Sequence, residues 1–376
     1  MIYCAHCLQP DTRPNTVFHP DGSCPACHYF RHLREVDWEE RFEILRDLIA
    51  GFPRPRGQGF DCIIGVSGGK DSTRQALLVR DKLGMRPLLA CLSYPPEQVT
   101  ERGVRNLSNL LELGFDMVIS APAPATWQRL VRESFLRFTN WCKSTELALF
   151  SSVPQLAIQH RIPLILWGEN PGLQLGDLRT LGKTGYDGNN LRQMNTLAGG
   201  EMGWMIEALG SDRMLAPYRY PTPAEFDAAG LQIVYLGWFL GDWSLVNNAG
   251  YSCGHGLEIR SDSAANTGDL YGVTSLDEDW VTLNQMIKYY KFGFGRATDY
   301  VNEEIRLGRL SREQGVEWVE RFDGACAPRY VEEFSEYIGI TVGQFWEQVH
   351  RSVNPRLFEV RPDGRIERRF RVGIGL

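Results

Sequence analysis

The sequence has no long hydrophobic run. No window reaches the roughly 20 apolar residues that a membrane-spanning helix needs. The first residues also lack the basic segment followed by an apolar segment that marks a secretory signal. These two absences predict a cytoplasmic protein that makes no membrane contact.

The chain also has little excess charge, with a formal net charge of -6 over 376 residues. Nucleic-acid-binding proteins usually carry a basic stripe, so the composition argues against a long nucleic-acid partner. Internal repeats and low-complexity segments are lacking. The apolar fraction of 43% is ordinary for a globular protein, and the length suffices for one large α/β domain with appendages.

Two common nucleotide-binding motifs are missing. A Walker A loop requires a glycine five residues before its Gly-Lys pair, but Ile64 and Asp177 stand at that distance before Gly69-Lys70 and Gly182-Lys183. No G-x-G-x-x-G fingerprint follows a predicted strand, so a dinucleotide cofactor is not indicated. These absences disfavour γ-phosphoryl transfer of the P-loop type and hydride transfer.

What the chain does contain is an apolar strand, Cys62–Val66, that enters a Ser-Gly-Gly turn and then a helix. Gly68 and Gly69 let the backbone approach phosphate oxygens, and the hydroxyls and first free N–H groups of the helix can donate to them. The pattern predicts an ATP pyrophosphate site, in which Asp71 holds Mg²⁺ or orients the turn, with simple capping of the helix as the alternative. The predicted ATP-binding residues are Val66, Ser67, Gly68, Gly69, Lys70, Asp71, Ser72 and Ser93.

Four of the nine cysteines stand near the amino terminus, as Cys4-x-x-Cys7 and Cys24-x-x-Cys27. Two thiolates on each tight turn suit tetrahedral Zn²⁺ and leave no room for a water ligand, so we expect a structural zinc site. A redox dithiol and an iron–sulfur cluster remain as alternatives for this spacing.

Short apolar strands alternate with amphipathic helices between residues 59 and 170, which predicts a doubly wound parallel sheet with ligands at the carboxyl ends of its strands. The expected strands are Cys62–Val66, Pro87–Leu92, Met117–Ser120 and Pro163–Trp167. The chain then becomes helical from residue 277, and a hairpin joins Phe358–Arg361 to Ile366–Phe370 around a Pro-Asp-Gly turn. The predicted organisation is a zinc ribbon at 1–35, a helix and linker at 36–58, an α/β domain at 59–270 and a helical region with a terminal hairpin at 271–376.

Several motifs together resemble the N-acetyl sugar amidotransferases of bacterial surface-polysaccharide (lipopolysaccharide) and flagellin-glycan biosynthesis, which belong to the PP-loop ATP pyrophosphatases (adenine nucleotide alpha hydrolase-like fold). The motifs are the two Cys-x-x-Cys pairs, Val66-Ser-Gly-Gly-Lys-Asp-Ser72, Trp141-Cys-Lys-Ser-Thr-Glu146, Trp167-Gly-Glu-Asn-Pro171, Gly185-Tyr-Asp-Gly-Asn-Asn190 and Tyr290-Lys-Phe-Gly-Phe-Gly-Arg-Ala-Thr-Asp299. The last of these is the most specific.

This resemblance implies conversion of a sugar acetamido group to an acetamidino group through an adenylated imidate. The implied cofactors are ATP, Mg²⁺ and a structural Zn²⁺. Ammonia would come from a HisH-like glutaminase acting with a HisF-like protein. The sugar substrate, free or nucleotide-linked, and the oligomeric state are left open.

Candidate catalytic residues are Asp71, Cys142, Lys143 and Glu169, and candidate residues for substrate or phosphate are Asn170, Lys183 and Arg296. Glu169 and Asn170 follow a strand end and are expected to face the cleft, with a structural turn as the alternative. The competing function is sulfur transfer through Cys142 and Cys253, because Lys143 can lower the pKa of a neighbouring thiol. A noncatalytic nucleotide-binding scaffold is a third alternative, and the aromatic run Tyr235–Trp243 suits either core packing or sugar stacking.

Overall fold

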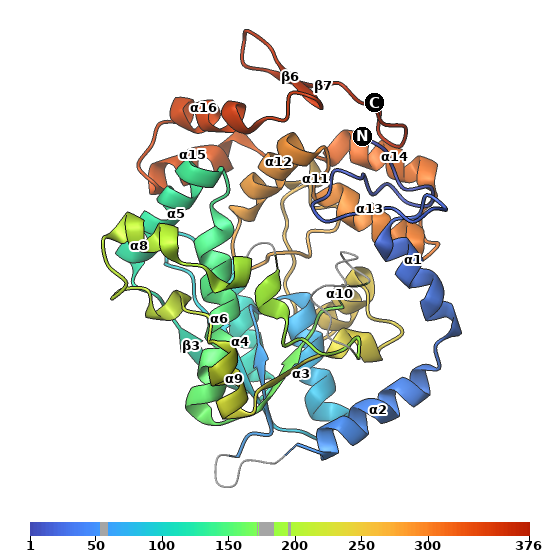
Figure 1. The fold of residues 1–376 in the computed structure, drawn as a ribbon, viewed down its shortest axis with the longest axis vertical. Helices are drawn as coiled ribbons and strands as arrows, with labels where there is room; N and C mark the ends of the chain where they lie inside the picture. The colour runs from blue at the N-terminus through green and yellow to red at the C-terminus, as the bar shows by residue number, and fades with distance from the viewer. Residues whose placement is uncertain (53–58, 171, 173–183, 195–196) are drawn as a thin grey trace.

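The computed structural model of the chain describes residues 1–52, 59–170, 172, 184–194 and 197–376. Its centre is a five-stranded, fully parallel sheet with strand order β3-β2-β1-β4-β5. The strands are β1 (Cys62–Gly65), β2 (Pro87–Leu92), β3 (Asp116–Ser120), β4 (Leu164–Trp167) and β5 (Gln232–Tyr235). The predicted doubly wound α/β fold is confirmed (Figure 1).

Helices cover both faces of the sheet. The helices up to residue 270 are α1 (Pro25–His32), α2 (Trp38–Ala50), α3 (Lys70–Asp81), α4 (Glu101–Glu112), α5 (Pro124–Phe138), α6 (Cys142–His160), α8 (Gly203–Leu209), α9 (Pro223–Ala229), α10 (Leu245–Cys253) and α11 (Ala264–Thr267). Alternate strand residues point to opposite faces. Ile63 and Ile165 pack with α5 and α6, whereas Ile64 and Leu166 pack with α2, α3 and α4.

A helical region follows and ends in a hairpin, as predicted. Its elements are α12 (Val281–Phe292), α13 (Arg296–Arg306), α14 (Arg312–Phe322), α15 (Pro328–Tyr337), α16 (Val342–Ser352), β6 (Phe358–Val360) and β7 (Ile366–Arg368). The expected capping box of α14 is present, since Ser311 Oγ accepts from the Gln314 amide while the Gln314 side chain accepts from the Ser311 amide.

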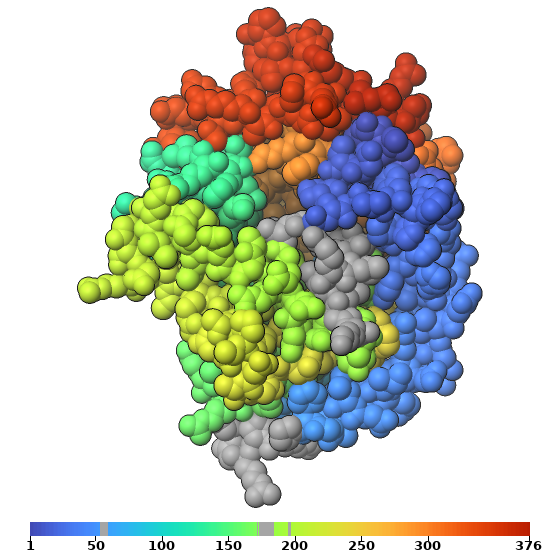
Figure 2. All heavy atoms as spheres, viewed as in Figure 1, coloured from blue at the N-terminus to red at the C-terminus, as the bar shows by residue number. Residues whose placement is uncertain are grey.

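The N-terminal segment packs on this C-terminal region. Tyr3 and Leu8 share a buried cluster with Val301, Val319 and Phe358. The two chain ends meet there, because the Leu376 amide donates to the Met1 carbonyl at 3.3 Å. Figure 2 shows the same face in space-filling form, with the N-terminal segment in blue against the orange and red C-terminal elements. The domain boundaries drawn from the sequence stay predictions.

β5 was not expected from the sequence. It lies at one edge of the sheet and is only four residues long. It ends at Tyr235, the first residue of the aromatic run 235–243, of which Tyr235, Phe239 and Trp243 are buried. These three side chains belong to the core, so the sugar-stacking interpretation is wrong for them, whereas Trp238 is only partly buried.

Membrane helices are absent from the described part of the chain, where no helix combines the length and the apolar character needed to cross a bilayer.

Candidate active site

A cavity of about 190 Å³ opens at the carboxyl ends of β1 and β4. The connections from these adjacent strands leave toward opposite faces, and such a switch point is where doubly wound sheets bind ligands. Its lining residues are Gly65, Val66, Ser67, Gly69, Lys70, Asp71, Ser72, Gln75, Ala90, Leu149, Phe150, Ser152, Val153, Trp167, Gly168, Glu169, Val273 and Ser275. The Ser-Gly-Gly turn and Glu169 therefore meet in one cavity.

The turn is shaped by Gly68, whose φ is +72°. A Cβ atom there would lie 3.0 Å from both the Asn106 Cβ and the Leu107 amide nitrogen of α4, so a larger residue does not fit. Gly69 is the N-cap of α3 and offers no side-chain acceptor to the first N–H groups of the helix. The first turn of α3 lines the cavity, and the partial positive charge of an uncapped helix start suits a phosphate.

Asp71 does not cap α3, so the capping alternative is wrong. Its Oδ2 accepts from Lys70 Nζ at 2.7 Å, and its Oδ1 accepts from Asn248 Nδ2 of α10 at 2.6 Å. Ser72 Oγ donates to the Gly69 carbonyl at 3.1 Å. The loop thus presents a lysine, a carboxylate and a hydroxyl to the same small space.

Glu169 provides a second carboxylate. Burial, together with the nearby Asp71 charge, raises the pKa of Glu169 from its ordinary value of 4.5 to about 7. A divalent cation would relieve the repulsion between these two carboxylates, so the donor set fits Mg²⁺. Asn170 is buried and donates from Nδ2 to the Gly237 carbonyl at 3.4 Å, outside the residues that line this cavity.

The C-terminal region reaches the same cavity through Val273 and Ser275. Ser275 adopts a left-handed backbone with φ of +48°, which is rare for a non-glycine residue. Behind it, Arg296 of α13 places Nη2 3.5 Å from Ser275 Oγ and Nη1 3.6 Å from the buried Asp269 carboxylate. Within the described residues Arg296 Nη1 makes no hydrogen bond. The Arg296 guanidinium is thus separated from the cavity by Ser275, which lines it.

Two other candidates, Ser93 and Lys143, lie elsewhere. Ser93 follows β2 and donates its hydroxyl to the Tyr94 carbonyl at 3.1 Å, outside the described lining of the cavity. Lys143 Nζ lies 4.6 Å from the centre of the Phe138 ring. Lys183 falls outside the described residues.

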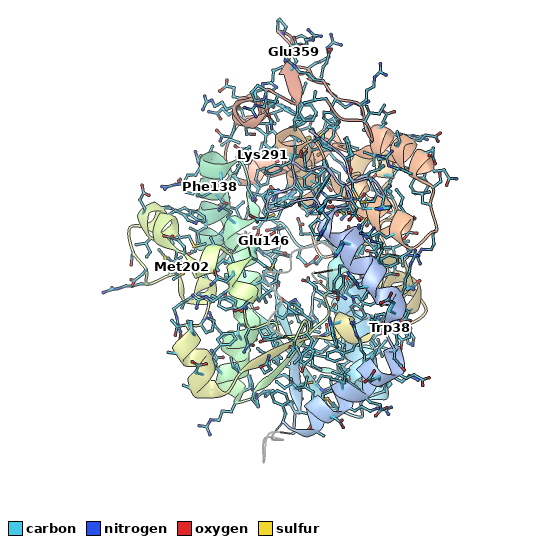
Figure 3. All side chains as sticks on the ribbon, turned by 45° about the vertical axis from the view of Figure 1, so that its right-hand side comes forward. Trp38, Phe138, Glu146, Met202, Lys291 and Glu359 are labelled. Carbon is cyan, nitrogen blue, oxygen red and sulfur yellow. The ribbon has the colours of Figure 1, made fainter. Side chains whose placement is uncertain are left out.

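Cys142 starts α6 and is buried. Its Sγ accepts from Asn284 Nδ2 at 2.8 Å. Burial, with the Glu146 and Glu278 carboxylates, raises the pKa of the Cys142 thiol well above its ordinary value. The expectation that Lys143 lowers the pKa of this thiol is therefore wrong, because burial and the two acids raise it. Glu146 lies one turn along α6, near the middle of the molecule (Figure 3).

Cys253 ends α10 and is exposed, with a pKa raised by partial burial. Neither Cys142 nor Cys253 is among the described residues that line the cavity at the Ser-Gly-Gly turn.

Sequence reasoning missed part of the cavity wall. Leu149, Phe150 and Val153 lie at helical spacing on one face of α6. This spacing is visible in the sequence, but it does not distinguish a cavity wall from an ordinary buried helix face. Gln75 donates from Nε2 to the Leu166 carbonyl at 2.6 Å and so joins α3 to β4. Ser275 carries no local signal, because only the tertiary fold brings it to the loop.

The four N-terminal cysteines form one cluster. All four are buried, and their sulfur atoms lie within 4.8 Å of one another. Backbone amides point at the sulfurs, from His6 to Cys4 Sγ at 3.4 Å, from Gln9 to Cys7 Sγ at 3.4 Å and from Cys27 to Cys24 Sγ at 3.4 Å. Such N–H groups stabilise thiolates. The donor set fits a closed four-coordinate metal site.

The C-terminal region is similar to a known protein family. Residues 271–370 match the family model described as "LPS biosynthesis protein WbpG-like, C-terminal domain". A search among curated proteins finds no significant match.

Two solved structures are similar at a low level. One is NMN synthetase from Francisella tularensis, with 19% identity, a TM-score of 0.27 and coverage of 36% of this chain and 56% of that one. The chain thus spans little more than half of that protein. The other is the U34-tRNA thiolase NcsA from Methanococcus maripaludis, determined with its 4Fe-4S cluster, with 12% identity, a TM-score of 0.27 and coverage of 90% and 95%. Neither similarity carries a conclusion about chemistry. The family match covers residues 271–370, and this C-terminal region is similar to that of WbpG-like lipopolysaccharide biosynthesis proteins.

Proposed function

We propose that this protein is an ATP-dependent amidotransferase that converts the acetamido group of a bacterial sugar to an acetamidino group and releases AMP and pyrophosphate. The observation that carries the proposal is the composite cavity. Its floor is the Ser-Gly-Gly turn, and part of its wall comes from the region that matches a lipopolysaccharide biosynthesis family.

The chemistry needs ATP because resonance makes an amide carbon a poor electrophile. In the first step, the amide oxygen attacks the α-phosphorus of ATP, and pyrophosphate leaves with the electrons of the broken P–O bond. In the second step, ammonia adds to the imidate carbon, and AMP departs with the former amide oxygen. The site must align oxygen with phosphorus and keep water from the imidate.

The residues of the cavity suit the first step. The N–H groups at the start of α3 and the Lys70 ammonium line the cavity and would stabilise the charge that develops on pyrophosphate. Mg²⁺ would be held by Asp71, with Glu169 close enough to share its charge. Arg296 would add a cation from the C-terminal side, through a short movement past Ser275.

Ammonia is favoured over a sulfur donor by the state of Cys142. A sulfur carrier must form a thiolate, whereas burial and the Glu146 and Glu278 carboxylates raise the pKa of the Cys142 thiol and so disfavour that thiolate. We therefore propose ammonia as the nucleophile, supplied by a HisH-like glutaminase with a HisF-like protein. The four-cysteine cluster is proposed to hold structural Zn²⁺.

The experiment is an analysis of nucleotide products with Mg²⁺, ammonium and candidate acetamido sugars. We expect sugar-dependent formation of equal amounts of AMP and pyrophosphate. ADP and orthophosphate as the primary products would overturn the proposal.

A further inference from the structure

Helix α10 packs across the first turn of α3 (Figure 1). Two of its residues, Asn248 and Ser252, lie one turn apart, and both side chains are completely buried. Asn248 Nδ2 donates to Asp71 Oδ1 at 2.6 Å, and Ser252 Oγ donates to the Lys70 carbonyl at 2.7 Å. Two consecutive residues of the phosphate-binding loop are thus held by a helix about 180 positions further along the chain.

The orientation of the Asn248 amide is fixed by chemistry. Its Oδ1 accepts from Arg74 Nη1 at 2.6 Å, and Arg74 in turn pairs with Asp242 Oδ1 at 2.7 Å. A guanidinium only donates and a carboxylate only accepts, so the amide oxygen must face Arg74 and the amide nitrogen must face Asp71. Arg74 is itself buried, so its position is fixed.

We propose that Asn248 and Ser252 are positioning residues that set the affinity of the loop for Mg²⁺–ATP. Asn248 holds one oxygen of Asp71, while Lys70 binds the other at 2.7 Å. Without Asn248, the carboxylate is free to turn fully onto Lys70, and an acid paired with a lysine is a poorer cation ligand. The inference rests on the proposed role of Asp71 as the residue that holds Mg²⁺.

The same contacts account for the Ser252-Cys-Gly-His255 segment. Ser252 faces inward and fixes the loop, whereas the next residue, Cys253, faces solvent. In this account the segment is needed for its serine rather than for its cysteine.

The test measures Mg²⁺–ATP binding by titration calorimetry, which does not depend on turnover. Asn248→Leu removes both amide contacts at similar volume, and we expect Mg²⁺–ATP to bind about ten-fold more weakly, in the range seen when residues that orient metal ligands are lost. Ser252→Ala should weaken binding less, because it leaves the carboxylate contact in place. Asn247→Ala is the matched control, since Asn247 lies on the same helix but bonds to Asp242 and Arg309 away from the cavity.

A merely structural role predicts a different pattern. If Asn248 acts through Asp71, the effect of Asn248→Leu should disappear in an Asp71→Asn background, whereas a packing defect would persist there. Unchanged Mg²⁺–ATP affinity in both folded variants, Asn248→Leu and Ser252→Ala, would overturn the inference. If the wild type binds Mg²⁺–ATP but yields ADP, the proposed function fails while this inference is still decided by the binding data.

Discussion

At the scale of single residues, Glu169 couples the site to pH. Its pKa of about 7 exceeds the ordinary 4.5 because the side chain is buried near Asp71. Between these two values the folded protein holds a proton that the unfolded chain releases, so the free energy of unfolding falls as the pH rises. Above pH 7 Glu169 is charged in the folded protein as well, and the full free-energy cost of burying that charge lowers the stability. The contribution that Glu169 makes to stability is thus largest in acid.

Replacing Glu169 by Gln should remove this dependence. Without ligand, the free energy of unfolding of Glu169→Gln should rise relative to wild type by up to about 3 kcal/mol between pH 4.5 and pH 8, as an order of magnitude. Denaturant titrations at several pH values measure the difference. A difference that stays constant over this range would show that Glu169 ionises normally.

Arg296 offers a second test at this scale. Arg296→Lys keeps a cation beside the buried Asp269 but loses the planar, forked donor set, so the fold should persist while the KM for ATP rises roughly ten-fold. Arg329→Lys, at an exposed pair with Asp262, is the control. An unchanged KM for ATP in Arg296→Lys would remove Arg296 from the phosphate site.

At the scale of elements, the sequence predicted those strands and turns that depend mainly on residues close together in the chain. The central strands β1, β2 and β4 and the Ser-Gly-Gly turn could be read from apolar runs and glycines, since a central parallel strand is buried on both faces. The edge strand β3 is less buried and was predicted from the shorter run Met117–Ser120. β5 could not be predicted, because its few residues merge into the aromatic run that follows. The partners of Asp71 and the position of Ser275 depend on contacts between distant segments. Such contacts leave no local pattern in a single sequence, so they could not be predicted.

We expect a bound metal ion to stabilise the cluster of four N-terminal cysteines. Metal analysis should give about one Zn²⁺ per chain, and Cys7→Ser should lose most of the metal and melt at a lower temperature, because a three-thiolate site admits water. Cys326→Ser, which changes a half-buried thiol outside the cluster, is the control. Wild-type metal content in Cys7→Ser would refute the assignment, and iron with inorganic sulfide would instead identify a cluster.

At the scale of the whole molecule, one helix of the C-terminal region contacts the N-terminal segment and also lies beside the cavity at the Ser-Gly-Gly turn. The N-terminal segment packs on the C-terminal region, where the Leu8 amide donates to Asn302 Oδ1 of α13 at 2.7 Å. The first residue of the same helix is Arg296, beside the cavity. Helix α13 thus contacts the N-terminal segment and also carries Arg296 beside the cavity. Asp299, on the same helix, pairs with Arg13 and Lys288.

In the proposed reaction, ammonia, activated by no cysteine, displaces AMP from an adenylated sugar amide. Its most direct test is mass analysis of the sugar product formed from ATP, Mg²⁺ and an acetamido sugar, with ammonium at mildly alkaline pH or with a sulfide donor. We predict that wild type and Cys142→Ala both yield a product in which NH replaces oxygen, and that sulfide yields no product. A thioamide sugar formed by wild type and lost in Cys142→Ala would contradict the account.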